Sequence, residues 1–479
     1  MSRLTEQDIE AIAGRIAADL QRGAPAAGRQ PAPAPAARDL GIFASVDEAV
    51  QAAREAQPTF VALPLKVRAK IIESIRRTML ENNEALARSA HEETGLGRVE
   101  DKVVKNRLVT EKTPGLEELY PQSMTGDHGL TLVEPAPFGV IGAITPSTNP
   151  TSTIICNAIG MLAAGNSVVF NAHPGARSCS MQTVALLNTA ITSAGGPRNV
   201  VTCLAEPTIE TAQQIMRHPS VRLIVVTGGG AVVRAAMASG KRAICAGPGN
   251  PPVVVDETAN IDKAGRDIVL GASTDNNIIC TDEKEVICVA MVADGLIKAM
   301  TRAGAVLIDH SRLPQLEKVI FSGMHGPHQR ADVNKDLIGK NADVILGKIG
   351  MSVPVTVRLG VVEVDENHPL LWTEQMMPIL PVCRVVSADA AIDLAVEVEG
   401  GNRHTAVMHS KNLDNLSRMA KECDCSIFVK NGRSQAGLGL DGEGYCSFTI
   451  ASPTGEGMTG PRSFSRYRRC VLVDHFRIT

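Results

Sequence analysis

Apolar and polar positions alternate along most of the chain with two different periods. After Leu40, a helical period of about 3.6 residues runs through three stretches. Four short apolar runs follow, separated by helix-like segments and turns, as expected of buried strands. This alternation is typical of a mostly parallel, doubly wound α/β sheet, which binds ligands at the carboxyl ends of its strands. The predicted helices cover residues 46–56, 66–81 and 83–93, and the predicted strands cover residues 139–145, 167–171, 200–204 and 223–227.

The pattern of apolar strands starts again near residue 250. An apolar run at 252–255 opens it, and a second run at 286–291 indicates another buried strand. A chain of 479 residues is too long for one ordinary hydrophobic core, so we expect two or three domains. The predicted fold class is therefore α/β, with two doubly wound units in succession.

An amphipathic helix is predicted at the N-terminus, outside these units. Isoleucine and leucine recur every three or four residues between residues 3 and 21, with charged residues on the other faces. Residues 23–38 are rich in Ala, Pro and Gly and cannot bury a core, so we expect an extended linker. A short amphipathic helix on a tether indicates docking onto a partner protein. The main alternative is a helix that folds back onto its own domain, whereas the mixed charges do not favour a membrane surface.

Composition narrows the function classes. The formal net charge is −3 and no basic patch stands out, so neither nucleic acid nor an anionic membrane is an expected partner. Eleven cysteines lack disulfide or metal-ligand spacing, which favours a reduced intracellular protein without a metal site. No signal peptide is expected, because the N-terminus lacks an apolar segment. Polar residues and prolines interrupt the longest apolar stretch, so no membrane span is expected and we predict a cytoplasmic protein.

Cys280 is the first candidate for chemistry. It follows a small polar loop, 272–277, and precedes the strand predicted at 286–291. A thiol at such a junction can face a cleft on rigid backbone, as a nucleophile requires. Since a free thiol is only a few per cent ionised at neutral pH, we expect the site to lower the pKa of Cys280. The alternative for an isolated cysteine is a small buried hydrophobic residue.

Asn149 lies in a second motif, where an apolar strand meets a helix-like stretch. The segment 145–150 is Thr-Pro-Ser-Thr-Asn-Pro. The Asn149 amide can donate to a developing oxyanion, and the backbone N–H of Cys280 would be the second donor. With these two motifs the chain resembles the aldehyde dehydrogenase family over roughly residues 40–479. It is most similar to the coenzyme A-acylating branch and its propionaldehyde dehydrogenases of bacterial microcompartments. The resemblance implies that Cys280 is the nucleophile and Asn149 the oxyanion donor.

The resemblance also implies a nicotinamide dinucleotide, NAD rather than NADP, although NADP is not excluded. An apolar strand ends in Thr227, Gly228 and Gly229, and such glycines let a pyrophosphate approach the N-terminus of the next helix. By resemblance, Glu374 holds the nicotinamide ribose. His404 is either a base, an orienting residue or a structural histidine. The other cofactor contacts that the resemblance implies are Thr145, Pro146, Ser147, Asn171 and His173.

A missing carboxylate indicates the acyl acceptor. Hydrolytic members of the family keep a glutamate before Leu-Gly-Gly that activates water, whereas this chain has Cys-Ala-Gly-Pro-Gly-Asn at 245–250. Without a general base, water attack on a thioester loses roughly 10²–10⁴ in rate, while a thiol arrives partly ionised. We therefore expect coenzyme A as cosubstrate and a short-chain aldehyde, propionaldehyde before acetaldehyde, as substrate. The alternatives are a hydrolytic or phosphorylating (semi)aldehyde dehydrogenase, a catalytically silent cargo protein, and a dinucleotide-binding regulator.

The resemblance completes the expected organisation. Helix-plus-linker extensions of microcompartment enzymes bind shell proteins, which implies a location inside a bacterial microcompartment. Runs at 130–133 and 470–473 resemble the family's bridging arms, so we expect a homodimer or homotetramer. Chemistry would lie in the cleft between the two large domains. The expected segments are a targeting helix at 1–20, a linker at 21–39, an NAD-binding domain at 40–249 with arm strands near 119–135, a catalytic domain at 250–441, and a C-terminal return and oligomerisation arm at 442–479.

Overall fold

The computed structural model describes residue 38 and residues 40–478. The predicted N-terminal helix and nearly all of the linker therefore lie outside the described residues. The chain divides into two units. The first comprises Met1–Leu86, Val109–Ala246 and Thr459–Thr479, and the second comprises Ala87–Leu108 and Gly247–Met458.

The first unit is built on a six-stranded sheet in which every neighbouring pair is parallel. Its strand order is β1-β6-β5-β4-β7-β8. The chain runs outward from β4 through β5 to β6, and then returns to β7 on the other side of β4. The order therefore reverses between β4 and β7, where ligands bind in open α/β sheets. The strands are β1 (Ile42–Phe43), β4 (Val140–Ile144), β5 (Ser167–Asn171), β6 (Val201–Leu204), β7 (Val221–Thr227) and β8 (Ala243–Ala246).

Helices supply the hydrophobic core of this unit. α3, α9 and α10 pack together with the sheet in one apolar cluster. α7 contacts β5, α4 and α8, and all of its residues are buried. Several helices begin at a side chain that accepts a backbone N–H, such as Ser45 before α3 and Thr208 before α9. The helices of this unit are α3 (Val46–Val61), α4 (Leu65–Glu81), α7 (Pro150–Ala163), α8 (Arg177–Ser193), α9 (Ile209–Arg217) and α10 (Gly230–Met237), with short 3₁₀ helices at Leu116–Glu118 and Pro174–Ala176. Most of α5 (Asn83–Thr94) and α6 (Val99–Lys112) belongs to the second unit, which includes residues 87–108.

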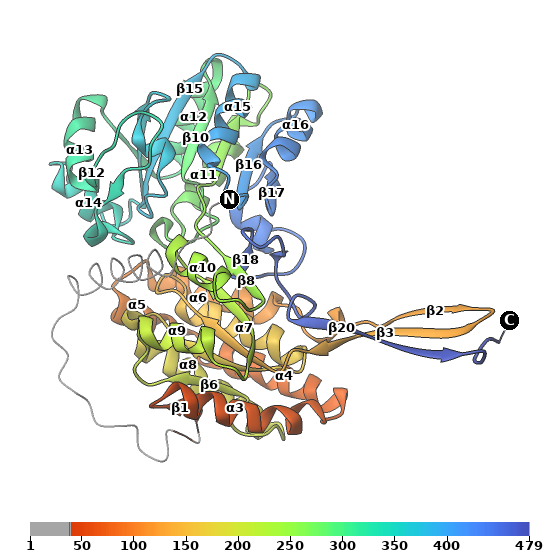
Figure 1. Cartoon of the computed structure of the whole chain (residues 1–479). Coiled ribbons are helices and arrows are strands. Elements are labelled where there is room, and N and C mark those ends of the chain that lie inside the picture. The colour runs from red at the N-terminus through yellow and green to blue at the C-terminus, as the bar shows by residue number, and fades with distance from the viewer. Residues whose placement is uncertain (1–37, 39, 479) are drawn as a thin grey trace. The chain divides into compact units, whose positions relative to one another are not determined.

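Three antiparallel strands form a separate ribbon in the first unit. β2 (Gln122–Gly126), β3 (Gly129–Pro137) and β20 (Ser465–Val473) lie side by side, with β3 in the middle (Figure 1). All residues of β20 after Ser465 are exposed. The strands predicted at 130–133 and 470–473 are thus confirmed, and they pair with each other from Leu130–Leu472 to Val133–Arg469.

The second unit contains a seven-stranded, fully parallel sheet in the order β11-β14-β15-β10-β9-β16-β17. Two small antiparallel pairs, β12 with β13 and β18 with β19, accompany it. Its strands are β9 (Pro252–Val255), β10 (Glu285–Val289), β11 (Ala305–Ile308), β12 (Phe321–Gly323), β13 (Asp332–Val333), β14 (Leu359–Val364), β15 (Ile379–Val385), β16 (Thr405–His409), β17 (Ile427–Lys430), β18 (Ile450–Ala451) and β19 (Gly457–Met458).

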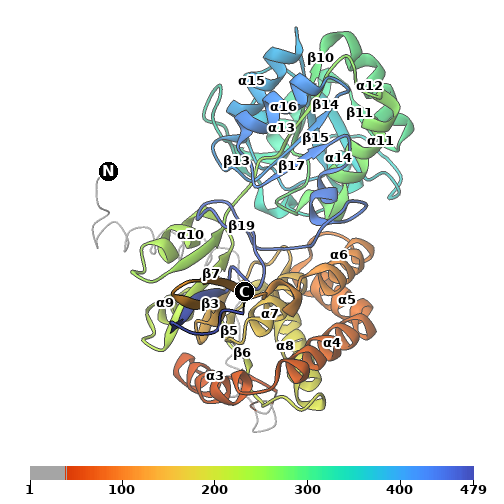
Figure 2. The same ribbon diagram turned by 90° about the vertical axis from the view of Figure 1, so that its right-hand side faces the viewer.

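Two groups of helices cover this sheet (Figure 2). α13, α14, α15 and α16 share one apolar cluster with the sheet, whereas α11 and α12 contact each other outside that cluster. The helices are α11 (Ile261–Ala272), α12 (Ala290–Arg302), α13 (Leu313–Ile320), α14 (Ala342–Lys348), α15 (Ala388–Glu399) and α16 (Leu413–Cys423), with 3₁₀ helices at Thr274–Asn277, His310–Arg312, Lys335–Leu337, Pro369–Trp372 and Ser434–Leu438.

The predicted α/β fold, with two parallel sheets, is confirmed. The seven helices and strands predicted between residues 46 and 227 are all present. The strand predicted at 286–291 overlaps β10 (Glu285–Val289), but its last two residues belong to α12. The units differ from the expected segments in two places: the second unit continues to Met458 instead of ending at residue 441, and residues 87–108 group with the second unit instead of staying with residues 40–249. The physical reason for the second difference is a set of buried ion pairs between α6 and the loop before Cys280, described below. Within the described residues, no helix is long and apolar enough to cross a membrane.

Candidate active site

In the first unit, the predicted residues gather where β4, β5 and β7 end. Thr145 follows β4, and its N–H donates to the carbonyl of Asn171, the last residue of β5, at 3.1 Å. Asn149 is the N-cap of α7 and is only 6% exposed. Pro146 and Ser147, between them, are half-buried. The strand-to-helix turn predicted around Asn149 is therefore present.

Asn171, at the end of β5, and His173, just after it, form side-chain hydrogen bonds within the first unit. Asn171 Nδ2 donates to the carbonyl of Thr208 at 3.2 Å, and Asn171 Oδ1 accepts from the Thr211 hydroxyl at 2.6 Å. His173 Nδ1 accepts from the N–H of Gly175 at 3.1 Å, and burial lowers the His173 pKa. His173 is therefore held neutral near pH 7, so it offers a hydrogen bond and not a positive charge.

The turn after β7 is open. The N–H of Gly228 donates to the carbonyl of Ala246 at 3.1 Å, and Gly229 is the N-cap of α10. No atom of the described residues lies within 4 Å of a Cβ built on Gly229. Gly229 thus leaves room beside the N-terminus of α10 at the switch point, and the first N–H groups of a helix have no partner within the helix, an arrangement that suits a phosphate.

In the second unit, the candidate residues lie at the edge of the sheet where the strands begin, whereas those of the first unit lie where the strands end. Gly249, Cys280, Glu374 and His404 come shortly before β9, β10, β15 and β16 respectively. These four strands are neighbours in the parallel sheet, in the order β15-β10-β9-β16. The amino ends of parallel strands meet at one edge, so the topology brings these residues together.

Gly249 is the point where they meet. Its N–H donates to Glu374 Oε1 at 3.4 Å. A Cβ at this position would lie 2.7 Å from the carbonyl oxygen of Cys280 and 3.0 Å from Cγ of His404. Any side chain would collide with backbone there, so a glycine is required for the close approach of Cys280 and His404.

Cys280 is half-buried, and its thiol is held in the protonated form. The pKa of Cys280 is raised to about 12, mainly by burial and secondly by the negative charge of Glu374. The positive charge of Lys284 lowers this pKa but offsets only part of the increase. The expectation that the site lowers this pKa is therefore wrong. The physical reason is that burial disfavours the charged thiolate and that the negative charge of Glu374 opposes it further.

His404 is fully buried and neutral. Its Nδ1 lies 2.8 Å from the Thr405 hydroxyl, and its Nε2 has no hydrogen-bond partner among the described residues. Burial, with the charge of Lys284, lowers its pKa to about 4. Burial also raises the pKa of Glu374 above its usual value. The amino edge therefore combines a thiol, a neutral imidazole with one buried and unpaired nitrogen, and a carboxyl group.

A buried run of charge behind Cys280 was not predicted. Residues 282–285, Asp-Glu-Lys-Glu, are all fully buried. The ammonium group of Lys284 donates to the Asn277 carbonyl at 2.7 Å, to Asn277 Oδ1 at 2.8 Å, and to the Ile279 carbonyl at 3.2 Å. A run of four charges normally indicates a solvated surface, and the only contrary signal is its position between a candidate nucleophile and an apolar strand.

The loop that precedes Cys280 has a constrained backbone. Asp275, Asn276 and Asn277 all have left-handed backbone, with φ of 46°, 57° and 66°. Each such residue is costly unless its surroundings hold it, and Asp and Asn tolerate it best. Asp275 is ion-paired with two buried lysines of α6, Lys102 at 3.0 Å and Lys105.

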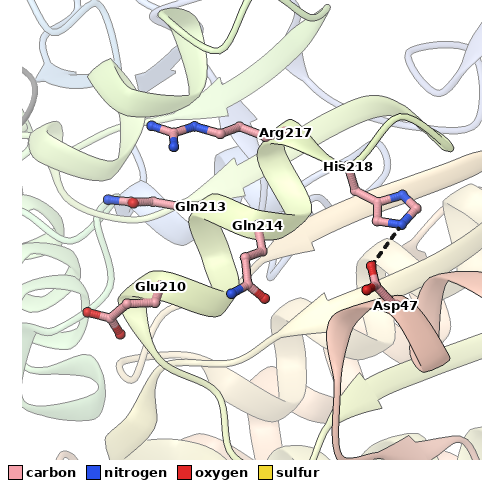
Figure 3. A pocket seen from close by; sticks show the side chains of 6 residues that line it. All are labelled: Asp47, Glu210, Gln213, Gln214, Arg217 and His218. Atoms are coloured by element: carbon pink, nitrogen blue, oxygen red, sulfur yellow. Dashed lines mark ion pairs between the residues drawn. The ribbon is translucent and has the colours of Figure 1, made fainter. Parts of the chain in front are cut away.

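A separate hollow of about 550 Å³ opens on the surface of the first unit (Figure 3). Polar side chains of α9 line it, and His218 is ion-paired there with Asp47 of α3 at 3.3 Å. It contains none of the predicted site residues. The described residues contain no cluster of His, Cys, Asp and Glu that could hold a metal ion.

Comparisons with known proteins give one consistent result. The aldehyde dehydrogenase family model matches residues 25–441. The acetylating acetaldehyde dehydrogenase of Salmonella typhimurium is 48% identical over 476 residues, covering 99% of this chain and 100% of that protein. The propionaldehyde dehydrogenase of Rhodopseudomonas palustris, solved with bound CoA and an acylated cysteine, is 50% identical with a TM-score of 0.88, covering 91% of this chain and 98% of that one. A propionaldehyde dehydrogenase from the fucose utilisation microcompartment of Clostridium phytofermentans is 46% identical with a TM-score of 0.89, covering 92% and 100%.

Proposed function

The chain belongs to the aldehyde dehydrogenase family, and we propose that it is a coenzyme A-acylating member that oxidises a short-chain aldehyde to an acyl-CoA. The observation that carries the proposal is the amino edge of the second sheet. There a half-buried thiol, Cys280, lies across Gly249 from His404, whose Nε2 is buried and has no hydrogen-bond partner among the described residues. A thiol can hold an acyl group as a thioester, and a neutral imidazole can accept the proton of a second thiol.

Acylation uses Cys280 and two donors. The Cys280 thiol gives its proton to a base, for which the neutral Nε2 of His404 is the candidate, and the thiolate attacks the aldehyde carbonyl. The resulting oxyanion receives hydrogen bonds from the Asn149 amide and from the backbone N–H of Cys280. Loss of one such donor typically costs about 10²–10³ in turnover. Hydride departure from the same carbon then leaves an acyl-Cys280 thioester.

A nicotinamide dinucleotide fits the first unit at the switch point between β4 and β7. When bound, it supplies the hydride acceptor. The space at Gly229 and its position as the N-cap of α10 support a pyrophosphate there. Glu374 is proposed to hold the nicotinamide ribose. The further proposed contacts are Thr145, Pro146, Ser147, Asn171, His173, Thr227 and Gly228.

The second half of the reaction is a thioester exchange. His404 is buried and neutral, so its Nε2 can accept the proton of the incoming coenzyme A thiol. The new thiolate attacks the acyl carbonyl, the bond to Cys280 breaks, and the sulfur of Cys280 leaves as the thiolate. The segment 245–250 carries no carboxylate to activate water instead.

Mass spectrometry of the enzyme during turnover tests this function. With propionaldehyde and NAD but no coenzyme A, we expect one acyl group on the peptide that contains Cys280, and coenzyme A should remove it as propionyl-CoA. Cys280→Ala should lose the adduct and the burst of NADH, whereas Cys288→Ser, at a buried cysteine of β10, should keep both. Free carboxylate formed equally fast with and without coenzyme A would indicate a hydrolytic enzyme.

Propionaldehyde is the proposed preferred substrate, followed by acetaldehyde. The relatives act on both, since the Salmonella enzyme is an acetaldehyde dehydrogenase and the Rhodopseudomonas enzyme a propionaldehyde dehydrogenase. A series of aldehydes of two to five carbons, compared by kcat/KM with coenzyme A, tests the order. A higher kcat/KM for the two-carbon aldehyde would reverse it.

Residues 1–20 are proposed to dock onto a microcompartment shell protein, so that the enzyme works inside the shell. The amphipathic pattern of this segment and the microcompartment origin of the Clostridium relative support this. Deleting residues 1–20 should keep activity in solution and abolish co-localisation with the shell. The matched substitution Ile12→Glu with Ile16→Glu should do the same, whereas Glu10→Gln on the polar face should not.

Assembly into a homodimer or homotetramer is proposed through the β2-β3-β20 ribbon. Val471, Leu472 and Val473 of β20 are 54%, 40% and 59% exposed. Apolar residues on an exposed edge strand favour pairing with another chain. Light scattering should show a smaller particle for Val471→Glu than for the unaltered protein, and an unchanged mass would exclude this surface.

A further inference from the structure

Hydrogen bonds fix the carbonyl group of the peptide that joins Ile279 to Cys280. The carbonyl oxygen of Ile279 accepts a hydrogen bond from Lys284 Nζ at 3.2 Å and from the N–H of Asp282 at 3.1 Å. The N–H of Ile279 donates to Asp282 Oδ2 at 3.1 Å. The residue before the nucleophile is therefore fixed at both of its backbone polar groups.

Holding this carbonyl also determines where the next N–H points. The carbonyl oxygen of Ile279 and the N–H of Cys280 belong to one peptide unit, and the described chain contains no cis peptide bond. In a planar trans peptide the two groups point in opposite directions. The N–H of Cys280 is therefore directed away from Lys284, and it lies within hydrogen-bonding reach of the Cys280 sulfur.

We propose that Lys284 is a positioning residue: by binding the Ile279 carbonyl, it keeps the N–H of Cys280 aimed at the oxyanion formed on the acyl carbon. This rests on the proposed function, in which Cys280 carries the acyl group. Asn149 would supply the other donor through its side chain. That side chain needs no such support from the nucleophile loop, residues 275–285.

The bonding of Lys284 supports a specific role. An ammonium group has three donors, and all three hydrogen bonds of Lys284 run to oxygens of Asn277 and Ile279. The charge of Lys284 lowers the pKa of Asp282 and Glu285, against the larger effect of burial, which raises the pKa of both. The hydrogen bonds of the buried ammonium group thus go to the backbone and amide of the nucleophile loop, and none of the three goes to a neighbouring acid.

A purely electrostatic role makes a different prediction. The charge of Lys284 also lowers the pKa of Cys280, so its removal would reduce the amount of thiolate. Every reaction of the sulfur would then slow by the same factor. Loss of the oriented N–H would slow only a reaction that passes through an oxyanion.

The experiment compares two reactions of the same sulfur in Lys284→Met. Alkylation of Cys280 by iodoacetamide needs the thiolate but forms no oxyanion, whereas the burst of NADH with propionaldehyde needs both. We expect the ratio of acylation rate to alkylation rate to fall about 10²-fold or more, the usual effect of losing one oxyanion donor. Lys102→Met is the matched control, because Lys102 is also a buried lysine but belongs to α6 and binds Asp275, at the start of the loop. Its ratio should stay within a few-fold of the unaltered enzyme.

Each outcome is decisive. Equal slowing of both reactions in Lys284→Met would overturn the inference and leave Lys284 with a charge effect alone. If the unaltered enzyme is alkylated but shows no burst, the proposed function fails instead. If Lys284→Met does not fold, a crystal structure of the acylated wild-type enzyme decides. The acyl oxygen must lie within hydrogen-bonding distance of the Cys280 nitrogen while Lys284 still binds the Ile279 carbonyl, and any other position of that oxygen overturns the proposal.

Discussion

The two ends of the nucleophile loop, 275–285, are both buried but carry opposite balances of charge. At the first end, one carboxylate, Asp275, faces two lysines of α6, Lys102 and Lys105. At the second end, one lysine, Lys284, is surrounded by three carboxyl groups in the run 282–285.

The balance of charge decides the protonation state of each end. Burial alone would raise the pKa of Asp275, but Lys105 and then Lys102 bring it below its usual value. In the run 282–285, burial dominates: it raises the pKa of Asp282 and Glu285 well above the usual range and that of Glu283 to about 7. The first end is therefore a permanently charged clamp, whereas the second holds its acids largely protonated around one ammonium group.

Removing the single acid of the first end should have the largest effect on stability. Asp275→Asn leaves two buried lysines without their counter-charge, and breaking a buried pair in this way typically costs about 3–5 kcal/mol. Urea unfolding at pH 7 measures the loss. Asp262→Asn is the control, because its pair with Arg302 is 82% and 63% exposed and should contribute below about 1 kcal/mol. An equal loss of unfolding free energy in the two variants would mean that the ion pairs of Asp275 do not stabilise the first end.

The clamp also explains which parts of the fold could be predicted from sequence. Strands and helices between residues 46 and 227 follow their hydrophobic period, and they are present as predicted. The grouping of 87–108 with the second unit could not be found in this way. α6 is rich in charge and looks like a solvated helix, and only the position of Asp275 in three dimensions reveals that Lys102 and Lys105 are buried partners.

The candidate site shows the same limit. Cys280 and Asn149 were predicted because a thiol at a loop–strand junction and an amide at a helix start are local features. The wrong expectation concerned the pKa of Cys280, which depends on Glu374, a residue distant in sequence. The role of the run 282–285 was missed for a related reason: periodicity assigns charged residues to the surface, and burial of four in succession depends on tertiary packing.

The second end should make stability depend on pH. Glu283 keeps its proton in the folded chain up to about pH 7, whereas its ordinary pKa is 4.5. The folded state therefore binds more protons between these values, so this contribution to stability is complete below pH 4.5 and is lost as pH rises through 7. The stability lost in this way is about 3 kcal/mol, because the pKa of Glu283 differs by roughly two to three between the folded and unfolded chain.

Glu283→Gln isolates this contribution. The variant should lose less stability between pH 5 and pH 8 than the unaltered protein, as measured by urea unfolding at both values. Glu257→Gln, at an exposed glutamate, should leave the pH dependence unchanged. A profile for Glu283→Gln that parallels the unaltered protein would show that Glu283 is ionised in the folded state, as Asp275 is.

The smallest effect concerns Cys280, which lies between the two ends. Because its pKa is raised to about 12, the thiolate fraction should increase about tenfold per pH unit between pH 7 and 9, and the rate of alkylation by iodoacetamide with it. Glu374 is the largest cause after burial, so Glu374→Gln should speed alkylation at pH 8 by a few-fold, up to about tenfold for a full pKa unit. Glu366→Gln is the matched control, since that acid raises the pKa of another thiol, Cys383. A rate that levels off below pH 9 in the unaltered enzyme would mean that Lys284 outweighs Glu374 at the sulfur, and that the second end of the loop activates the nucleophile as well as positioning it.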